Sequence, residues 1–348
     1  MNEARLQEFM GRLVVDMGGA AVMANVILGE ELGLYRAMAD GTPMTPEELA
    51  RRTGCNARLL REWLSAQAAS GYVEHEAGRF RLPPEQALAL ADEDSPVYVA
   101  GGAMVLASLY MDKDKLVAAM RGNGALSWAD HHPCLFKGTE RFFRPGYRAN
   151  LVSNWLPALD GVVQRLEQGA KVADIGCGHG ASTIVLAQAY PNSSFYGFDF
   201  HEPSIEQARQ RAAAAGVEKR TSFAKASAKE FPGQDFDLVC FFDCLHDMGD
   251  PVGAARRAHA ALKPGGTVLL VEPFANDDLE QNLNPVGRLF YAASTCVCTP
   301  NSLSQEVGLG LGAQAGEKRL RHVFMEAGFR QFRRATETPF NLVLEARK

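Results

Sequence analysis

Apolar residues recur at helical spacing from Ala21 to Ala39, which predicts helical structure over these residues. A shorter helix is expected next, because Thr45 has the side chain of an N-cap and Pro46 occupies the first helical position. Glu48, three residues after the cap, completes a capping box. Gly54 is the expected end of that helix.

Asn56 is the expected N-cap of another helix, and Gly71 closes it. The following stretch, "YVEHEAGRFRL", alternates strand-like residues about a turn at Ala77 and Gly78, which is typical of a hairpin. Helix, turn, helix and hairpin together resemble a winged-helix domain. The second helix carries Leu59, Leu60, Trp63 and Leu64 and no lysine cluster, so the pattern favours packing or dimerisation over DNA binding.

Residues 85 to 165 are expected to form several helices. The uncharged run from Ser95 to Met111 is shorter than the ~20 apolar residues that span a bilayer, so it predicts a buried helix. The segment just before Lys171 is unusually aromatic, and its Tyr147 and Trp155 are candidates either for a ligand pocket or for the core.

From Lys171 onward, strand-like and helical stretches alternate, which indicates a parallel sheet with helices on both faces. The last two strand-like segments are separated by a short turn near Thr338, so they are expected to be antiparallel. The predicted fold class is α/β: a Rossmann-like seven-stranded sheet with an antiparallel last strand, plus a mostly helical winged-helix domain. The expected divisions are 1–95 for the winged helix, 96–165 for a helical connector and 166–348 for the sheet domain.

The stretch "VADIGCGHGAS" follows the first strand and fits two kinds of cofactor loop. Read through Gly176, Gly178 and Ala181, it fits the dinucleotide fingerprint of NAD enzymes. Read through Asp174 and the glycines, it fits a loop for S-adenosylmethionine. Asp174 would lie beside a pyrophosphate, where the repulsion is about 4 kcal/mol per charge pair at roughly 4 Å and an effective dielectric near 20. The sulfonium and ammonium groups of S-adenosylmethionine would instead be attracted.

The second strand ends at Asp199, whose carboxylate is suited to accept hydrogen bonds from both ribose hydroxyls, and Phe200 follows as a candidate adenine contact. An acid at this point also serves NAD, so Asp199 does not discriminate between the two cofactors. It is also a possible N-cap of the next helix.

Four segments, "VADIGCGHG", "GFDF", "FDLVCFFDCLHDMGDP" and "ALKPGGTVLLVEP", resemble in order and spacing the motifs of class I S-adenosylmethionine-dependent methyltransferases. The resemblance covers roughly residues 145 to 348. With the front domain, the chain is similar to bacterial small-molecule methyltransferases that carry an N-terminal winged-helix dimerisation domain. The resemblance implies S-adenosyl-L-methionine as cofactor and O- or N-methylation of a small acceptor. The chain departs from the family at Ser227 and Ala228, where an acidic residue often receives the adenine amino group.

The loop after the fourth strand carries the candidate chemistry. Phe242 and Asp243 resemble residues that flank the cofactor in this family. His246 is the candidate general base, because its ordinary pKa lies near 6.5; packing beside adenine or capping the next helix is the alternative. Asp247 is expected either to orient His246 or to cap that helix.

Glu272 ends the fifth strand and is a candidate contact for an acceptor hydroxyl or amine, or a cap of the following turn. Phe290 and Tyr291 fall where the family inserts its substrate helices, so they are expected pocket walls. The glycine-rich stretch between Val307 and Glu317 is either a lid or a surface loop.

Composition limits the partners, metals and cell compartment that we expect for the protein. The formal charge of -5 argues against sequence-independent binding to nucleic acid. Seven cysteines without framework spacing fit reduced thiols, and the C-x-C pair at Cys296 and Cys298 has no zinc-like ligand set, so no metal is expected. Charged residues through the first turns argue against a signal peptide. We therefore expect a cytoplasmic homodimer without membrane partners; a cofactor-sensing winged-helix regulator and an RNA methyltransferase are the alternative functions.

Overall fold

The computed structural model describes residues 1–348 and divides them into two compact units. The N-terminal unit comprises Met1–Ser108 and Pro133–Gly146, and the C-terminal unit comprises Leu109–His132 and Tyr147–Lys348. The connector expected at 96–165 is therefore divided between the units, because helices α6 (Gly102–Met111) and α8 (Cys134–Asn150) each contribute residues to both.

The N-terminal unit begins with helices and a small hairpin: α1 (Glu3–Glu31), α2 (Leu34–Met38), α3 (Pro46–Thr53), α4 (Ala57–Ala69), β1 (Glu74–Glu76), β2 (Arg79–Arg81) and α5 (Pro84–Leu90). The predicted capping box is confirmed, since the Thr45 side chain accepts from the backbone of Glu48 while the Glu48 carboxylate accepts from the backbone of Thr45. The hairpin turn is confirmed at Ala77 and Gly78, both of which have positive φ.

The second half of α1 is anchored in the N-terminal core. Val22 and Val26 are buried, and the indole Nε1 of Trp63 on α4 donates to the carbonyl of Asn25 at 2.8 Å. A Cβ at Gly29 would lie 2.5 Å from the Trp63 ring, so only glycine allows this approach. The first half of the helix has no such cover and exposes its apolar side chains.

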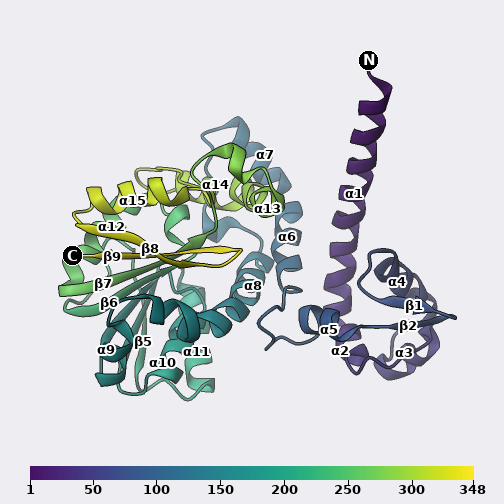
Figure 1. Cartoon of the computed structure of the whole chain (residues 1–348), viewed down its shortest axis with the longest axis horizontal. Coiled ribbons are helices and arrows are strands. Elements are labelled where there is room, and N and C mark those ends of the chain that lie inside the picture. The colour runs from purple at the N-terminus through teal and green to yellow at the C-terminus, as the bar shows by residue number, and fades with distance from the viewer. The chain divides into compact units, whose positions relative to one another are not determined.

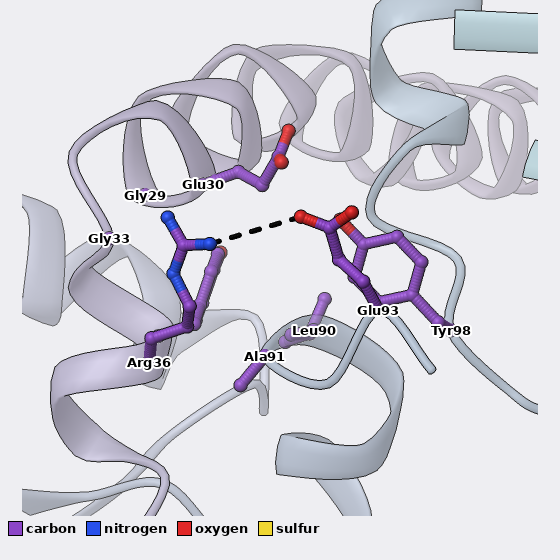
Figure 2. Close-up of a pocket in the computed structure, with 9 residues that line it drawn as sticks. Gly29, Glu30, Gly33, Arg36, Leu90, Ala91, Glu93 and Tyr98 are labelled. Carbon is purple, nitrogen blue, oxygen red and sulfur yellow. Dashed lines mark ion pairs between the residues drawn. The ribbon is translucent and has the colours of Figure 1, made fainter. Parts of the chain in front are cut away.

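Figure 2 shows a small hollow in the N-terminal unit where charged side chains face one another. Arg36 and Glu93 form an ion pair at 3.8 Å, and Arg141 lies 2.7 Å from the Tyr98 hydroxyl. Arg141 also pairs with Glu30 and Glu93. These contacts tie segments of this unit together, although the Oε2 of Glu30 is buried without a hydrogen-bond partner.

The expectation of one buried helix from Ser95 to Met111 is wrong for its first part. Residues before Gly102 form turns, and only Gly102–Met111 is helical. A Cβ at Gly101 would lie 2.6 Å from the Cβ of Arg141, so the turn is shaped by contact with α8, which is distant in sequence. Tyr110 at the far end is 69% exposed.

The C-terminal unit is built on a seven-stranded sheet, as predicted, in the order β5-β4-β3-β6-β7-β9-β8. The strands are β3 (Lys171–Ile175), β4 (Ser194–Asp199), β5 (Thr221–Lys225), β6 (Phe236–Phe242), β7 (Leu262–Pro273), β8 (Gln331–Glu337) and β9 (Asn341–Arg347). Strands β3 to β7 pair in parallel, whereas β9 runs antiparallel to both neighbours. The predicted antiparallel final pair is confirmed.

Helices cover both faces of the sheet, with α10 and α11 on one side and α12 and α15 on the other (Figure 1). The helices of this unit are α7 (Lys113–Arg121), α9 (Val162–Gln168), α10 (Ala181–Ala189), α11 (Glu202–Ala214), α12 (Pro251–Ala261), α13 (Pro285–Ala293), α14 (Thr299–Leu303) and α15 (Gly316–Glu326). Two π-helical turns, η2 (Leu151–Trp155) and η6 (Ser294–Cys298), join neighbouring helices.

The chain runs from β3 outward through β4 to β5 and then returns to the other side of β3 at β6, so the strand order reverses at β3. Ligands of open α/β sheets bind at such a switch point, at the carboxyl ends of the strands. The loops after β3, β4, β6 and β7 begin at this edge, and they carry the candidate residues.

Candidate active site

The glycine loop after β3 requires glycine at several positions. Gly176, Gly178 and Gly180 all have positive φ, a conformation that side chains disfavour. A Cβ at Gly176 would lie 2.8 Å from the Sγ of Cys244, whereas nothing stands within 4 Å of one at Gly178. The loop is therefore packed against the β6 loop on one side and open on the other, which leaves room for a ligand.

Asp174 lies at the end of β3 and is buried. Its Oδ2 accepts hydrogen bonds from the hydroxyls of Ser182 and Thr183, each at 2.6 Å, while its Oδ1 is buried with no partner. Burial raises the pKa of Asp174 to about 6, although the two hydroxyls oppose that shift. The Oδ1, which has no partner, remains available to accept a hydrogen bond from a ligand.

Asp199 is positioned by the backbone on both sides. Its Oδ2 accepts from the N–H of Gly178 at 3.0 Å and its Oδ1 from the N–H of His201 at 2.8 Å. Burial raises the pKa of Asp199, and the two backbone hydrogen bonds oppose the shift. Phe200 follows with a ring that is 46% exposed, as a face for stacking requires.

Ser227 and Ala228 lie just after β5, beside the end of β4, because the N–H of Ala226 donates to the Asp199 carbonyl at 3.0 Å. The Ser227 hydroxyl reaches only Glu230, at 3.4 Å. The structure thus brings this pair to the same edge as Asp199, where the sequence places them.

An aromatic group closes the β6 side of the site. Tyr147 lies 5.4 Å from Phe242 and 6.1 Å from Trp155, measured between ring centroids. All three rings are buried, and the indole Nε1 of Trp155 is buried without a partner. The structure therefore brings Tyr147, Trp155 and Phe242 together.

Asp243 is held next to Tyr147 by two hydrogen bonds. Its Oδ2 accepts from the Tyr147 hydroxyl at 3.0 Å and its Oδ1 from the amide of Asn341 at 2.9 Å, with a φ of 51°. Burial and the nearby Glu272 carboxylate raise the pKa of Asp243 to about 8. Asn341 lies on the last strand, and no sequence signal pointed to it.

His246 and Glu272 form a buried pair. The Nδ1 of His246 lies 2.5 Å from the Oε2 of Glu272, and the other oxygen of Glu272 accepts from the N–H of Leu245 at 2.9 Å. Burial lowers the pKa of His246, but the Glu272 carboxylate and the Cys298 thiol outweigh it, so the pKa lies well above its usual value.

The structure gives the hydrogen-bond partners of Glu272 and Asp247. Each oxygen of Glu272 has one partner, the Leu245 N–H or His246, so Glu272 orients His246, and its contact with an acceptor stays a prediction. Asp247 does not orient His246; its side chain bonds with Asn301 instead, and burial raises its pKa to about 7. The adjacency of β6 and β7 in the sheet explains why a residue 26 positions away is the partner.

The segment after β7 lines the same loop. Phe290 is buried on α13, Tyr291 beside it is half-buried, and Cys298 on η6 hydrogen-bonds with His246. The glycine-rich stretch is exposed at Val307 and Leu309, as in a surface loop, but its second half is packed. The N–H of Gly312 donates to the His246 carbonyl at 3.1 Å and that of Ala313 to Ser294 at 3.0 Å, so this half lies against the His246 backbone.

The fold and the loops at its switch point define a class I methyltransferase domain preceded by a winged-helix domain. In agreement, residues 166–328 match the family model described as a methyltransferase domain. Residues 19–92 match a model described as an Rv2258c-like winged HTH domain. These two matches confirm the resemblance found in the sequence.

Individual relatives agree with this assignment. The ubiquinone biosynthesis O-methyltransferase of Pseudomonas aeruginosa is 36% identical over 134 residues, which are 38% of this chain and 54% of that protein. The 27-O-demethylrifamycin SV methyltransferase of Amycolatopsis mediterranei is 37% identical over 107 residues, covering 30% of this chain and 39% of the relative. This chain thus spans about half the length of the curated relatives it matches, or less.

Solved structures share the fold over the whole chain. The mitomycin 7-O-methyltransferase MmcR has a TM-score of 0.69 at 21% identity and covers 100% of both chains. Human N-acetylserotonin methyltransferase, solved with S-adenosylmethionine, has a TM-score of 0.69 at 21% identity and covers 97% of each chain.

Proposed function

We propose that the protein transfers a methyl group from S-adenosyl-L-methionine to an oxygen of a small-molecule acceptor. The observation that carries this is the buried His246–Glu272 pair, held at the ends of β6 and β7 beside the glycine loop. A hydroxyl must lose its proton during methylation, and an imidazole fixed by a carboxylate is suited to accept it. An amine acceptor would not need such a base.

The residues fit the proposed cofactor. S-adenosylmethionine supplies an electrophilic methyl group on a positively charged sulfur. Asp199, positioned by two backbone N–H groups, is assigned to the ribose hydroxyls, and Phe200 to the adenine face. Asp174 with its unpartnered Oδ1, and the open side of the loop at Gly178, are assigned to the amino-acid end, and Gly176 supports the loop from its packed side.

The remaining contacts follow from placement in the sheet. Ser227 and Ala228 lie beside Asp199, so a hydroxyl or a backbone carbonyl there is assigned to the adenine amino group. Phe242 and Asp243 are assigned to the wall between cofactor and acceptor. Because Asp243 is already bonded to Tyr147 and Asn341, its role is to hold that wall rather than to exchange a proton.

His246 must be neutral to accept a proton. Its raised pKa means that the imidazolium form is favoured while Glu272 and Cys298 face it. With the positively charged cofactor bound, the His246 imidazolium would face a like charge, which would lower its pKa and favour the neutral form that accepts a proton. In the reaction, the acceptor O–H gives its proton to His246, and Glu272 stabilises the charge that forms.

Tyr147, Trp155, Phe290 and Tyr291 are assigned to the acceptor pocket and its support. Three of these rings are buried and that of Tyr291 is half-buried, so together they limit the access of water to the reacting atoms, which an in-line transfer between aligned groups requires. An apolar, ring-shaped acceptor with an ionisable hydroxyl fits this lining.

We also propose that the protein is a cytoplasmic homodimer that binds neither nucleic acid nor membrane. Helix α1 is long and apolar enough to cross a membrane by length and composition, but core helices and signal sequences pass the same test. Its exposed residues Leu6, Met10, Leu13 and Met17 recur at intervals of four and three. That spacing is typical of a helix that packs along another helix, so a second copy is the proposed cover.

Calorimetry with S-adenosylhomocysteine, followed by a screen of phenols, catechols, amines and thiols for its release from S-adenosylmethionine, tests the proposal. His246→Ala should lower turnover by roughly 10² to 10⁴ while leaving cofactor affinity nearly unchanged. His259→Ala, at a half-buried histidine packed on Phe329, is the matched control. A His246→Ala protein that loses cofactor binding and turnover together would reassign His246 to nucleoside packing.

A further inference from the structure

A second carboxylate–histidine pair is buried in the C-terminal unit, outside the residues assigned above. Asp112 and His131 are 1% and 4% exposed, and the Nδ1 of His131 lies 2.9 Å from the Oδ2 of Asp112. The same oxygen accepts from the backbone N–H of His132 at 2.9 Å, and Lys115 donates to the other oxygen at 2.8 Å. Each acceptor position of Asp112 therefore has a partner.

The Nε2 of His131 is different, because it is buried and has no hydrogen-bond partner. Asp112 is ionised, since the hydrogen bonds from Lys115 and from the two histidines outweigh its burial and lower its pKa. For His131, burial lowers the pKa, although Asp112 opposes the shift. Near neutral pH the ring is thus neutral, its Nδ1–H donates to Asp112, and its Nε2 presents an unused lone pair.

Two contacts place this pair beside the catalytic loop. The N–H of Trp128 donates to the Oδ1 of Asn301 at 3.0 Å, and the amide of Asn301 donates to the Asp247 carbonyl at 3.1 Å. One side chain thus joins the turn that leads into His131 to the residue after His246.

The second contact runs through η6. Cys296 packs on an apolar cluster formed by Leu116, Ala119 and Leu126, in the same segment as the Asp112–His131 pair. Two residues further along η6, Cys298 hydrogen-bonds with His246. The segment 109–132 and His246 therefore both contact the same short turn, η6, which joins α13 to α14.

We propose that His131 is a second recognition residue for the acceptor, whose Nε2 accepts a hydrogen bond from a hydroxyl or N–H group away from the methylated atom. A buried acceptor without a partner destabilises the protein, and a donor on the ligand that pairs with it removes this penalty, so it adds to the binding free energy. Because the ring is neutral and its lone pair faces outward from Asp112, it selects donors and disfavours carboxylates and methyl ethers at that point. The identity of the ligand as the methyl acceptor rests on the proposed function.

The test uses phenol and the three dihydroxybenzenes, catechol, resorcinol and hydroquinone, titrated calorimetrically into the full chain loaded with S-adenosylhomocysteine. At least one dihydroxybenzene should bind tenfold or more tightly than phenol. His131→Phe keeps the ring but removes the acceptor, so it should bring that compound to the affinity of phenol and leave phenol and cofactor affinities unchanged. His131→Gln, whose amide oxygen can accept, should restore part of the difference.

The matched control is His259→Phe, the same exchange at a half-buried ring outside this segment, which should change none of these affinities. Dihydroxybenzenes that bind no better than phenol, or a preference that survives His131→Phe, would overturn the proposal. A lower melting temperature of His131→Phe without loss of the preference would show a purely structural pair. Intact binding preference with no methyl transfer to any acceptor would instead reject the proposed function and keep the site.

Discussion

At the scale of single residues, the decisive feature is which carboxylate faces His246. Glu272→Gln keeps an oxygen for the Leu245 N–H but replaces the charge opposite Nδ1 with a donor amide. The neutral imidazole then carries its proton on the other nitrogen and is unable to accept one from the acceptor. We expect turnover to fall by roughly 10² or more. Asp247→Asn is the control, and an equal loss in that variant would return the orienting role to Asp247.

The same pair predicts a pH dependence of stability. His246 has a raised pKa in the folded protein, so its contribution is complete below the ordinary value of about 6.5 and is lost as pH rises through the folded value. The melting temperature of the protein should therefore exceed that of Glu272→Gln most clearly near pH 6, with a gap that narrows above pH 7. A gap that widens with pH over this range would contradict the assigned ion pair.

Asp199 gives the corresponding prediction for the cofactor. Asp199→Ala removes charge-assisted hydrogen bonds in a partly buried site, so it should weaken S-adenosylhomocysteine binding by roughly 2 to 3 kcal/mol, measured by calorimetry. Asp199→Asn keeps an acceptor for the Gly178 N–H and should lose less. An unchanged dissociation constant in the alanine variant would leave Asp199 with a purely structural role in the loop.

At the scale of elements, the contact between the glycine-rich stretch and His246, the proposed base, can be tested by a matched pair of variants. Gly312 and Gly310 both have positive φ, but a Cβ at Gly312 would lie 2.7 Å from the Ser294 Oγ, whereas at Gly310 the nearest atom is 3.6 Å away. Both alanine variants carry the cost of a side chain in the left-handed backbone region, roughly 1–2 kcal/mol. Only Gly312→Ala also disturbs the contact with the His246 carbonyl, so it should lose turnover and several degrees of melting temperature beyond Gly310→Ala. Equal effects would show that the stretch does not support the base.

The elements also show how far sequence reasoning reached. Helix α3 was predictable because its signals, Thr45, Pro46 and Gly54, act within a few residues. The turn before α6 was not predictable, because Gly101 is required there by its close contact with Arg141, forty positions further along the chain. Glu272 was identified at the right edge of the sheet, but its partner depends on the pairing of β6 with β7, which only the assembled sheet reveals.

At the scale of the whole molecule, the exposed half of α1 predicts self-association. Met10 and Leu13 are 47% and 39% exposed and belong to the apolar stripe defined above by its four-and-three spacing. Two carboxylates placed in that stripe stay hydrated in a monomer but lose water when a second helix covers them, so they raise the free energy of the dimer more than that of the monomer. Light scattering should therefore find a dimer for the native chain and a monomer for the double variant Met10→Glu, Leu13→Glu.

Arg12→Glu is the matched control, because it changes the net charge by the same two units at a neighbouring position whose side chain is 74% exposed and pairs only with Glu8. It should remain a dimer, and all three proteins should bind S-adenosylhomocysteine equally, since the cofactor residues lie in the C-terminal unit. A monomeric native chain would contradict the prediction. Flotation of the native chain with vesicles, lost in the double variant, would instead assign the stripe to a membrane surface.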